Sequence, residues 1–456
     1  MTDTEKIADL ELKLAEALAE IARLNALLGK KVVKKTSANS HLSPSMDLNR
    51  SLEKNRSLRT KSEKPVGGQI GHEGHTLLQS ESPDVIVDLV PAYCNACGKS
   101  LSEAEFELLG SRQVVDIPPI TAITTAYRCF GTKCSCGHAT KGSYPSGVAQ
   151  PIQYGENVQS LSVYLSVFQF VPFGRLQDFF KNVCNLAISK GTIENMIRRT
   201  SDKAEPVYAQ IAALISKSFY VGADETGFKC KGEKHWFWVW QNMVLTYIVA
   251  AASRAKSVIT DTFPEGLPQT ILGSDRLAAQ LSTVRKGFQL CIVHLLRDLQ
   301  YLCESEKMAW ATDFKTLLKD AINLKQAKPA YLPDDPLYID IITRANNLLK
   351  LAVLEQQLTD ETLHKETITF FTQMRRLQEG LFPFLLDERI PFDNNGSERA
   401  IRNVKVKMKV SGQFKALHHQ FAVLRSVIDT ARKNGQPVWA AIQAIVNLPM
   451  STSKAG

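Results

Sequence analysis

The chain has 456 residues, and because one hydrophobic core seldom organises more than roughly 200, two or more domains with linkers are expected. Hydrophobic residues make up 44% and charged residues 22% of the sequence, which is typical of a globular protein and excludes a disordered one. No apolar run is long enough to span a bilayer, so no membrane partner is expected. Charged residues recur from Asp3 through Lys13, where a signal peptide would be apolar, which favours a cytoplasmic location.

The net charge of +9 is unevenly distributed along the chain. From Lys30 to Lys64, ten Lys and Arg residues stand against three acids, Asp47, Glu53 and Glu63. Clustered cations gain affinity for a phosphate backbone by releasing its counterions, so the charge favours nucleic acid as the partner. A solvated charged linker is the alternative.

Residues 1–30 are predicted to form a short coiled coil. Apolar side chains repeat at two heptad positions, which are Ile7, Leu14, Ile21 and Leu28, and Leu10, Ala17 and Leu24. Such a seam favours self-association, as a dimer at least, and an amphipathic helix packed on its own domain is the alternative. The polar, basic residues 31–82 that follow are typical of a linker that orders on DNA.

Five cysteines between Cys94 and Cys136 predict a zinc-binding domain over residues 83–145 in a reducing compartment. Strands expected at Asp84–Val90 and Gln113–Tyr127 would frame it as a zinc ribbon. Cys94-x-x-Cys97-Gly98 is a knuckle in which two thiolates share one tetrahedral Zn²⁺. Three further thiols are candidates for the other two ligands, which are Cys129, Cys134 and Cys136. Buried free cysteines are the alternative.

Residues 150–215 are predicted to be helical. Ile188–Ile193 reads as a tight turn that leads into a helix carrying Arg198 and Arg199. This arrangement resembles a helix-turn-helix, in which the two arginines would bind DNA. An ordinary helical hairpin with solvated arginines is the alternative.

From residue 216 onward the pattern is strand-like. The expected elements are strands at Phe219–Ala223, His235–Gln241 and Met243–Ala251, a helix near Ala255–Phe263, and strands near Thr270–Gly273 and Phe288–Val293. This order is typical of a ribonuclease H-like α/β fold, with its first part in residues 216–294. A helical insertion at 295–388 would interrupt it, and the final part would occupy 389–448, before a tail at 449–456. The fold class predicted is therefore multidomain α+β.

Three carboxylates are candidates for one site. Asp224 and Asp275 each follow a predicted strand, so they would lie side by side if those strands pair. Glu398 lies on a helix after Asp393, and either Asp393 or Asn395 could cap that helix. Phosphoryl transfer needs hard oxygen ligands for two Mg²⁺ or Mn²⁺ ions, which activate the attacking oxygen and stabilise the leaving one. A single Asp or Glu is more often a surface charge or a cap.

At these residues the sequence resembles the insertion sequence 66 family of bacterial DDE transposases, over nearly the whole chain. The matching segments are the N-terminal coiled coil, Gly67-Gly68-Gln69-x-Gly71-His72-x-Gly74-His75, Cys94-x-x-Cys97, Tyr154-Gly155, Pro172-x-x-Arg175-Leu176, Ile188-Ser189-x-Gly191-Thr192-Ile193, Ala223-Asp224-Glu225-Thr226, Ser274-Asp275, Cys291-x-x-His294-x-x-Arg297 and Asp393-Asn394-Asn395-x-x-Glu398-Arg399-x-x-Arg402.

The resemblance implies that Asp224, Asp275 and Glu398 are a metal-binding catalytic triad that cuts element ends and joins the 3′-hydroxyl to target DNA. It implies transposon and target DNA as partners, possible accessory proteins of the same element, and a location at the nucleoid. Cys136-Gly137-His138 resembles the family's knuckle ending, which favours Cys129 and Cys136 as the remaining zinc ligands, with Cys134 able to replace either.

Several residues near the acids have smaller expected roles. Arg399 and Arg402 flank Glu398, and they could hold phosphate or orient the acid; a surface ion pair is the alternative. Glu225 would point to the opposite face of the sheet from Asp224, so it is assigned no metal. His294 is expected to contact the metal-binding acids without binding metal itself, or to have a structural role.

The sequence departs from the family pattern at two places. Arg276 and Gln280 follow Asp275 where the family usually has Gly and Tyr, and Lys407-Met408-Lys409-Val410 replaces an Arg-Lys-Asn pattern. Neither change removes a metal ligand, so an active enzyme is expected. Two rival functions are a nuclease of the same fold that only hydrolyses DNA and a DNA-binding regulator with an idle core.

Overall fold

The computed structural model describes residues 13–20, 35–36, 39–40, 71, 73, 77–103, 105–358 and 364–449. Residues 13–20 form a helix with exposed side chains. The rest of the predicted coiled coil lies outside the described residues, as do most of the predicted linker, all but Gly71 and Glu73 of the glycine-rich segment, and the tail after residue 449. Of the helices in the described ranges, none is both long and apolar enough to cross a membrane.

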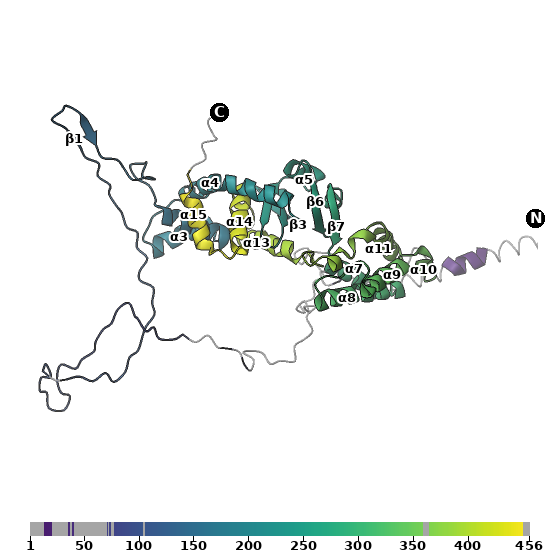
Figure 1. The fold of residues 1–456 in the computed structure, drawn as a ribbon, viewed down its shortest axis with the longest axis horizontal. Helices are drawn as coiled ribbons and strands as arrows, with labels where there is room; N and C mark the ends of the chain where they lie inside the picture. Colours follow the sequence, from purple (N-terminus) through teal and green to yellow (C-terminus); the bar gives the residue numbers. More distant parts are fainter. Residues whose placement is uncertain are drawn as a thin grey trace, which may run out of the picture.

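The cysteine-containing region has one small hairpin, in which β1 (Gly131–Lys133) pairs antiparallel with β2 (Ala139–Lys141). The predicted strands at Asp84–Val90 and Gln113–Tyr127 are wrong, because neither run pairs with another segment in the described structure. Their apolar side chains are exposed, including that of Leu89. High β-propensity produces a strand only where a neighbour completes the hydrogen-bond ladder and a face is buried. Figure 1 shows this region projecting from the helical body.

The first compact part is helical. It comprises α2 (Glu156–Val163), the π-helical turn η1 (Tyr164–Phe168), α3 (Phe173–Val183) and α4 (Lys190–Ser216). The Ser189 hydroxyl caps α4 by accepting a hydrogen bond from the Thr192 N–H, so the sequence Ser-Lys-Gly-Thr starts the helix where a turn was predicted. The buried face of α4 joins the same core as the sheet that follows, for example through Ile193 and Ile211.

The central sheet has five strands in the order β5-β4-β3-β6-β7. The strands are β3 (Tyr220–Cys230), β4 (Glu233–Gln241), β5 (Thr246–Ala251), β6 (Leu267–Ser274) and β7 (Arg285–Leu290). β3, β4 and β5 pair antiparallel, and β6 and β7 are parallel to β3. Two short helices, α5 (Lys256–Thr262) and α6 (Ala278–Leu281), connect the later strands.

Two boundaries in this sheet differ from those predicted. β3 continues to Cys230, so Asp224 lies inside the strand and not after it, because β4 pairs with β3 from Gly222 to Cys230. The run Phe288–Val293 is not one strand, since β7 ends at Leu290 and Ile292 begins a helix. A continuous apolar run cannot by itself distinguish a buried strand from a buried helix start.

Three C-terminal helices return to the sheet after the insertion. They are α13 (Asn395–Ser411), α14 (His418–Lys433) and α15 (Val438–Asn447), and Figure 1 shows them beside α4 and β3. α14 covers the free edge of β5, because the Ser426 and Thr430 hydroxyls accept hydrogen bonds from the Ile248 and Thr246 N–H groups at 2.9 and 3.0 Å. This edge is therefore closed to pairing with another strand.

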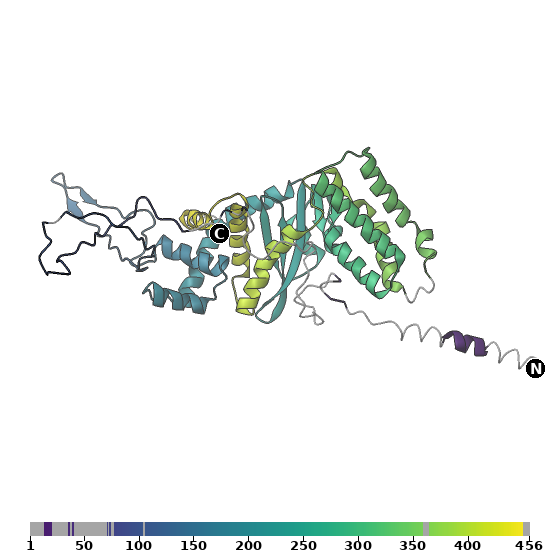
Figure 2. The same ribbon diagram turned by 90° about the horizontal axis from the view of Figure 1, so that it is seen from below.

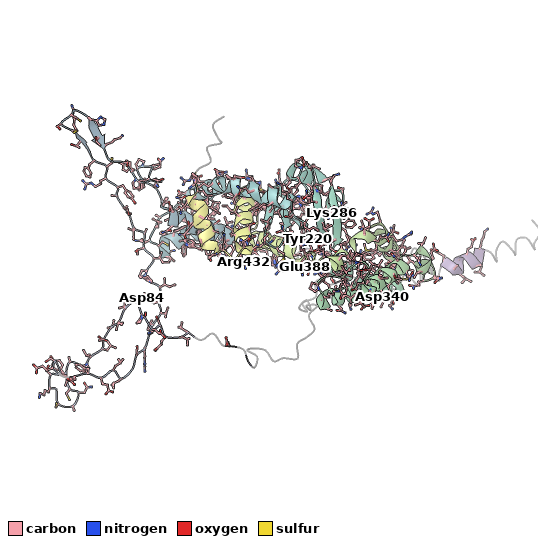
Figure 3. All side chains as sticks on the ribbon, viewed as in Figure 1. Asp84, Tyr220, Lys286, Asp340, Glu388 and Arg432 are labelled. Carbon is pink, nitrogen blue, oxygen red and sulfur yellow. The ribbon has the colours of Figure 1, made fainter. Side chains whose placement is uncertain are left out.

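A helical insertion separates β7 from α13. Its elements are α7 (Ile292–Ser305), α8 (Ala309–Ala327), α9 (Pro336–Leu348), α10 (Leu351–Glu355), α11 (Lys365–Arg376), the 3-10 turn η2 (Gln378–Gly380) and α12 (Pro383–Leu386). It has its own core around Trp310 and Phe314, whose rings stack at 5.2 Å. In Figure 2 the insertion lies on one side of the sheet and the α2–α4 region on the other, and Figure 3 labels Asp340 in the insertion and Tyr220 in the sheet. The architecture is a mixed α/β one.

Candidate active site

The parallel pairing of β3 with β6 brings two acids together. Gly222 lies opposite Gly273 in the register of these strands, so Asp224 and Asp275 each follow by the same two residues. β6 ends at Ser274, and the chain turns away after it, so both carboxylates lie where the β3–β6 pairing stops. The carboxyl end of adjacent parallel strands is where open α/β sheets place their ligands.

The N-terminus of α13 brings the third acid to the same place. The Asn394 side-chain amide donates a hydrogen bond to the Ala223 carbonyl oxygen at 2.8 Å, next to Asp224 in the strand. The Glu398 N–H bonds to the Asn394 carbonyl oxygen, and the Asp393 carboxylate accepts from the Asn395 N–H at 3.0 Å, so the start of α13 is held in place. Glu398 is therefore one helical turn from a residue that is fixed to β3.

Gly222 permits this close approach. A Cβ atom at this position would lie 2.8 Å from Asn394 Oδ1 and 2.9 Å from Ser397 Oγ, so a larger residue would push α13 away from the sheet. A glycine two residues before an acid inside a strand is the sequence signal of such an approach, and reasoning from the sequence overlooked it.

Asp224 is a buried acid with other acids around it. Burial raises the pKa of Asp224 well above its usual value, and the negative charges of Asp275, Glu225 and Glu398 raise it further. Asp275 Oδ1 is buried and has no hydrogen-bond partner among the described residues. A divalent cation at this place would satisfy the unpartnered oxygen and neutralise the repulsion between the acids.

The donor set suits a hard cation. Carboxylate oxygens are the ligands that Mg²⁺ and Mn²⁺ prefer, and Asp224, Asp275 and Glu398 supply them. Within the described ranges, however, no three His, Cys, Asp or Glu side chains are arranged so that they could hold one metal ion. The acids are neighbours whose chemistry fits the cation, and their positions do not yet form a coordination sphere.

His294 and Cys291 lie at the start of α7, where they contact Glu398 and Asn394. His294 Nε2 is 3.7 Å from Glu398 Oε1, and burial lowers the pKa of this histidine. Cys291 Sγ accepts a hydrogen bond from the Asn394 N–H at 3.3 Å, and burial raises the pKa of the thiol to about 12. Cys291 is therefore a neutral buried thiol, and its hydrogen bond joins the start of α7 to the start of α13.

Glu225 lies on the opposite face of β3 from Asp224. Its buried carboxylate accepts hydrogen bonds from Arg254 Nε at 2.9 Å and from Gln280 Nε2 at 3.0 Å. Gln280 Oε1 in turn accepts from the Ser274 hydroxyl at 2.5 Å, so Glu225 supports the residue before Asp275. Gln280 therefore connects Glu225 to Ser274 through its two hydrogen bonds.

The family model described as "Transposase IS66 family" matches residues 151–420, which is more than half of the chain. The chain belongs to the IS66 transposase family. No curated protein matches it. The matched range extends from just before α2 to the start of α14, so it includes the sheet, the helical insertion and all three acids. The family resemblance of the sequence is confirmed, the protein is a transposase, and DNA is its partner. A DDE transposase family implies a divalent metal such as Mg²⁺.

Arg276 follows Asp275 in the turn after β6 and has a positive φ. Its φ of 79° lies in the left-handed region, which costs roughly 1 kcal/mol or more for a residue with a side chain. The side chain forms an ion pair with Asp298 on α7 and donates a hydrogen bond to Gln373 Oε1 on α11 at 2.9 Å. The helical insertion thus offsets the strain of the turn next to Asp275.

Substitutions at Arg276 should separate the stabilisation by its side-chain bonds from the strain of its positive φ. We expect Arg276→Ala to destabilise the transposase by about 2–4 kcal/mol, because it loses charge-assisted bonds and keeps the positive φ. Arg276→Gly loses the same bonds and relieves the strain, so its free energy of unfolding should exceed that of the alanine variant by about 1 kcal/mol. Urea unfolding of both variants measures the difference, and an alanine variant as stable as the glycine variant would contradict the account.

The predicted DNA-binding arginines lie in two places. Arg198 and Arg199 are exposed near the start of α4, where Arg198 forms an ion pair with Glu194 at 3.1 Å. Together with Thr192 and Asn195 they line a hollow of about 360 Å³. The other two, Arg399 and Arg402, are exposed on α13 beside Glu398.

The cysteine region of this transposase lies before the matched range. Cys94 and Cys97 share a tight turn, and backbone N–H groups of Cys97 and Ala96 lower the pKa of Cys94. A similar turn holds Cys134 and Cys136, where the Cys136 N–H lowers the pKa of Cys134. Cys129 instead donates a hydrogen bond from its thiol to the Gly142 carbonyl oxygen at 3.1 Å.

Proposed function

We propose that this transposase cuts DNA at the ends of a bacterial insertion sequence and joins the freed 3′-hydroxyl to target DNA by direct phosphoryl transfer. Asp224, Asp275 and Glu398 are the residues that hold the catalytic cations in this proposal. The observation that carries it is the meeting of three carboxylates at the end of the β3–β6 pairing, one buried and repelled by its neighbours and one with an unpartnered oxygen.

The sheet supports this proposal. Three antiparallel strands followed by two strands parallel to the first, in the order β5-β4-β3-β6-β7, form the arrangement expected of a ribonuclease H-like core. In that arrangement the acids stand at the centre of the sheet, at the point where antiparallel pairing gives way to parallel pairing. The helical insertion supports the second acid through Arg276, and α13 delivers the third.

Each residue of the site would have a separate role in the proposed reaction. Cations held by Asp224, Asp275 and Glu398 would supply activation of the attacking hydroxyl and stabilisation of the leaving oxygen. Asp224 is held rigidly by its strand, and Asp275 is oriented by the turn that Ser274 and Arg276 support. Glu398 is placed by the Asn394 bond to β3. Arg399 and Arg402 are then available to hold phosphates of the DNA next to the acids.

Zinc binding is also part of the proposal. Cys94 and Cys97 would bind one Zn²⁺ with Cys136 and a fourth thiolate, and the matching turns favour Cys134 over Cys129 for that place. The predicted coiled coil of residues 1–30, the accessory proteins and the nucleoid location stay predictions. A hydrolytic nuclease would share the acids, and an idle DNA-binding regulator would not need them.

A strand-transfer assay tests the proposed function. Purified protein with Mg²⁺, a labelled duplex carrying the element end and a supercoiled plasmid should yield plasmid covalently joined to the labelled 3′ end. Donor cleavage without joined plasmid would favour the nuclease, and donor binding without cleavage would favour the regulator. Asp261→Asn, which removes an exposed carboxylate on α5, is the control that should behave as wild type.

A further inference from the structure

A second polar site lies at the far end of β3 from the acids. A pocket of about 460 Å³ opens between α4, the turn from β3 to β4 and the loop before α14. The charged side chains and histidines that line it are Arg198, Lys231, Glu233, His235, Lys415 and His418. Three of these are permanent cations at neutral pH and one is an acid. Among the described residues, neither Lys231 nor Lys415 forms an ion pair, and both are exposed.

The backbone that carries the two lysines is fixed in position. The Lys231 N–H donates to the Phe414 carbonyl oxygen at 3.0 Å, and the Phe414 N–H donates to the Lys229 carbonyl oxygen at 2.9 Å. The Gly232 N–H also bonds to Gln413 Oε1 at 2.9 Å. The Phe414 ring packs against Phe228 in the core. Two loops that are distant in sequence are thus locked together with their lysines on the same pocket, which reduces the cost of ordering them on an anion.

The pocket and the acids belong to the same face of the same strand. Cys230 follows Asp224 by six residues, and an even separation in a strand places both side chains on one face. The Cys230 thiol contacts His418 Nδ1 at 3.6 Å, inside the pocket. At about 3.3 Å per residue, the pocket lies roughly 20 Å from Asp224, the length of about six base pairs of duplex DNA.

Helix α13 connects the two places with a row of positive charge. Glu398, Arg402, Lys405 and Lys409 follow one another at helical spacings of four, three and four residues, so they share one side of α13. Arg402 and Lys409 are exposed, and the helix ends at Ser411, just before Lys415. The charged side of α13 therefore leads from the third acid toward the pocket.

We propose that this pocket binds the phosphate backbone of the duplex that the acids act on, about six base pairs from the phosphate that is cut. Lys231 and Lys415 are the phosphate-binding residues, and Arg402, Lys405 and Lys409 bind the phosphates between. The inference rests on the proposed function, because it takes the acids to be the place of cutting. The pocket contacts phosphates and no base edges, so its contribution to affinity is the same for any DNA sequence.

DNA binding measured in the Glu398→Gln background tests the pocket without cleavage. We expect Lys231→Gln with Lys415→Gln to weaken binding of a 30-base-pair duplex on the order of tenfold, and to reduce the slope of log affinity against log salt by about 1.8. An element end and an unrelated duplex should lose the same factor. The matched control is Lys319→Gln with Lys365→Gln, which removes two exposed lysines from α8 and α11 of the insertion.

Unchanged affinity and slope in the pocket variant would overturn the proposal, as would an equal loss in the control. Neutral methylphosphonates placed one at a time along the duplex locate the contact. Those about six base pairs from the cut should weaken wild-type binding and have no effect on the pocket variant. If the acids do not cut DNA, the proposed function is wrong and there is no cut phosphate from which to count base pairs. The binding affinity and the salt slope would still decide whether the pocket binds phosphate.

Discussion

Replacing Asp224 with asparagine should abolish DNA cleavage, by at least about a thousandfold, and at the same time leave the metal-free protein as stable as wild type or more so. The carboxylate supplies a cation ligand in the proposed function, and an amide oxygen is a much weaker one. In the absence of the cation, however, the charge on Asp224 is buried beside Asp275 and Glu398, so it destabilises the fold. Asparagine has nearly the same shape and no charge.

The pH dependence gives a second readout. The pKa of Asp224 is raised in the folded state, so between the ordinary pKa of an aspartate and this raised value the folded protein binds more protons than the unfolded chain. The free energy of unfolding of the metal-free wild type should therefore fall as pH rises through that window. Asp224→Asn should lack this contribution.

Thermal unfolding in EDTA and in Mg²⁺ measures both effects. Mg²⁺ should raise the melting temperature of wild type and have little effect on Asp224→Asn, because a cation that binds only the folded protein stabilises it by mass action. Asp261→Asn should follow wild type in every condition. An Asp224→Asn protein that cleaves DNA at the wild-type rate would contradict the assignment of the triad, whereas a variant that simply fails to fold would contradict the expected stability.

Removing Asp429 should cost about 3–5 kcal/mol, the largest single effect on stability that we expect. This residue forms a buried ion pair with Arg425 within α14, with Arg425 Nη2 2.7 Å and Nε 3.0 Å from its two carboxylate oxygens. The guanidinium also lies over the rings of Phe168 and Phe170, at 5.1 and 5.4 Å. Asp429→Ala would leave this guanidinium buried without its partner, at the place where α14 meets the α2–α4 region.

The Arg425–Asp429 ion pair should be replaceable by two apolar residues with little loss of stability. Burial raises the pKa of Asp429 and lowers that of Arg425, so the cost of burying the two charges exceeds their mutual attraction. We therefore expect Arg425→Met combined with Asp429→Leu to recover most of the stability that Asp429→Ala loses. Urea unfolding of the single and double variants measures this coupling. A loss below about 1 kcal/mol in Asp429→Ala would show that water or rearrangement relieves the lone arginine.

Local patterns predicted most of the elements around the candidate site. Alternating apolar residues correspond to β3, β4 and β5, and helical periodicity corresponds to α4, α7 and α13. These patterns report which face of a segment is apolar, and that property is carried by each segment separately. The same reasoning failed at Asp84–Val90 and Gln113–Tyr127, because a strand also needs a partner, and partners are set by the rest of the chain.

The sequence alone determined the residue types of the site and their order: Asp224 and Asp275 after apolar runs, and Glu398 near a helix start. Family resemblance added their roles, and the matched family covers all three. Only the tertiary structure decided what surrounds them. The Arg276–Asp298 pair, the approach of α13 over Gly222 and the pocket of Lys231 and Lys415 each join segments far apart in sequence, and such contacts follow from packing, which no local pattern encodes.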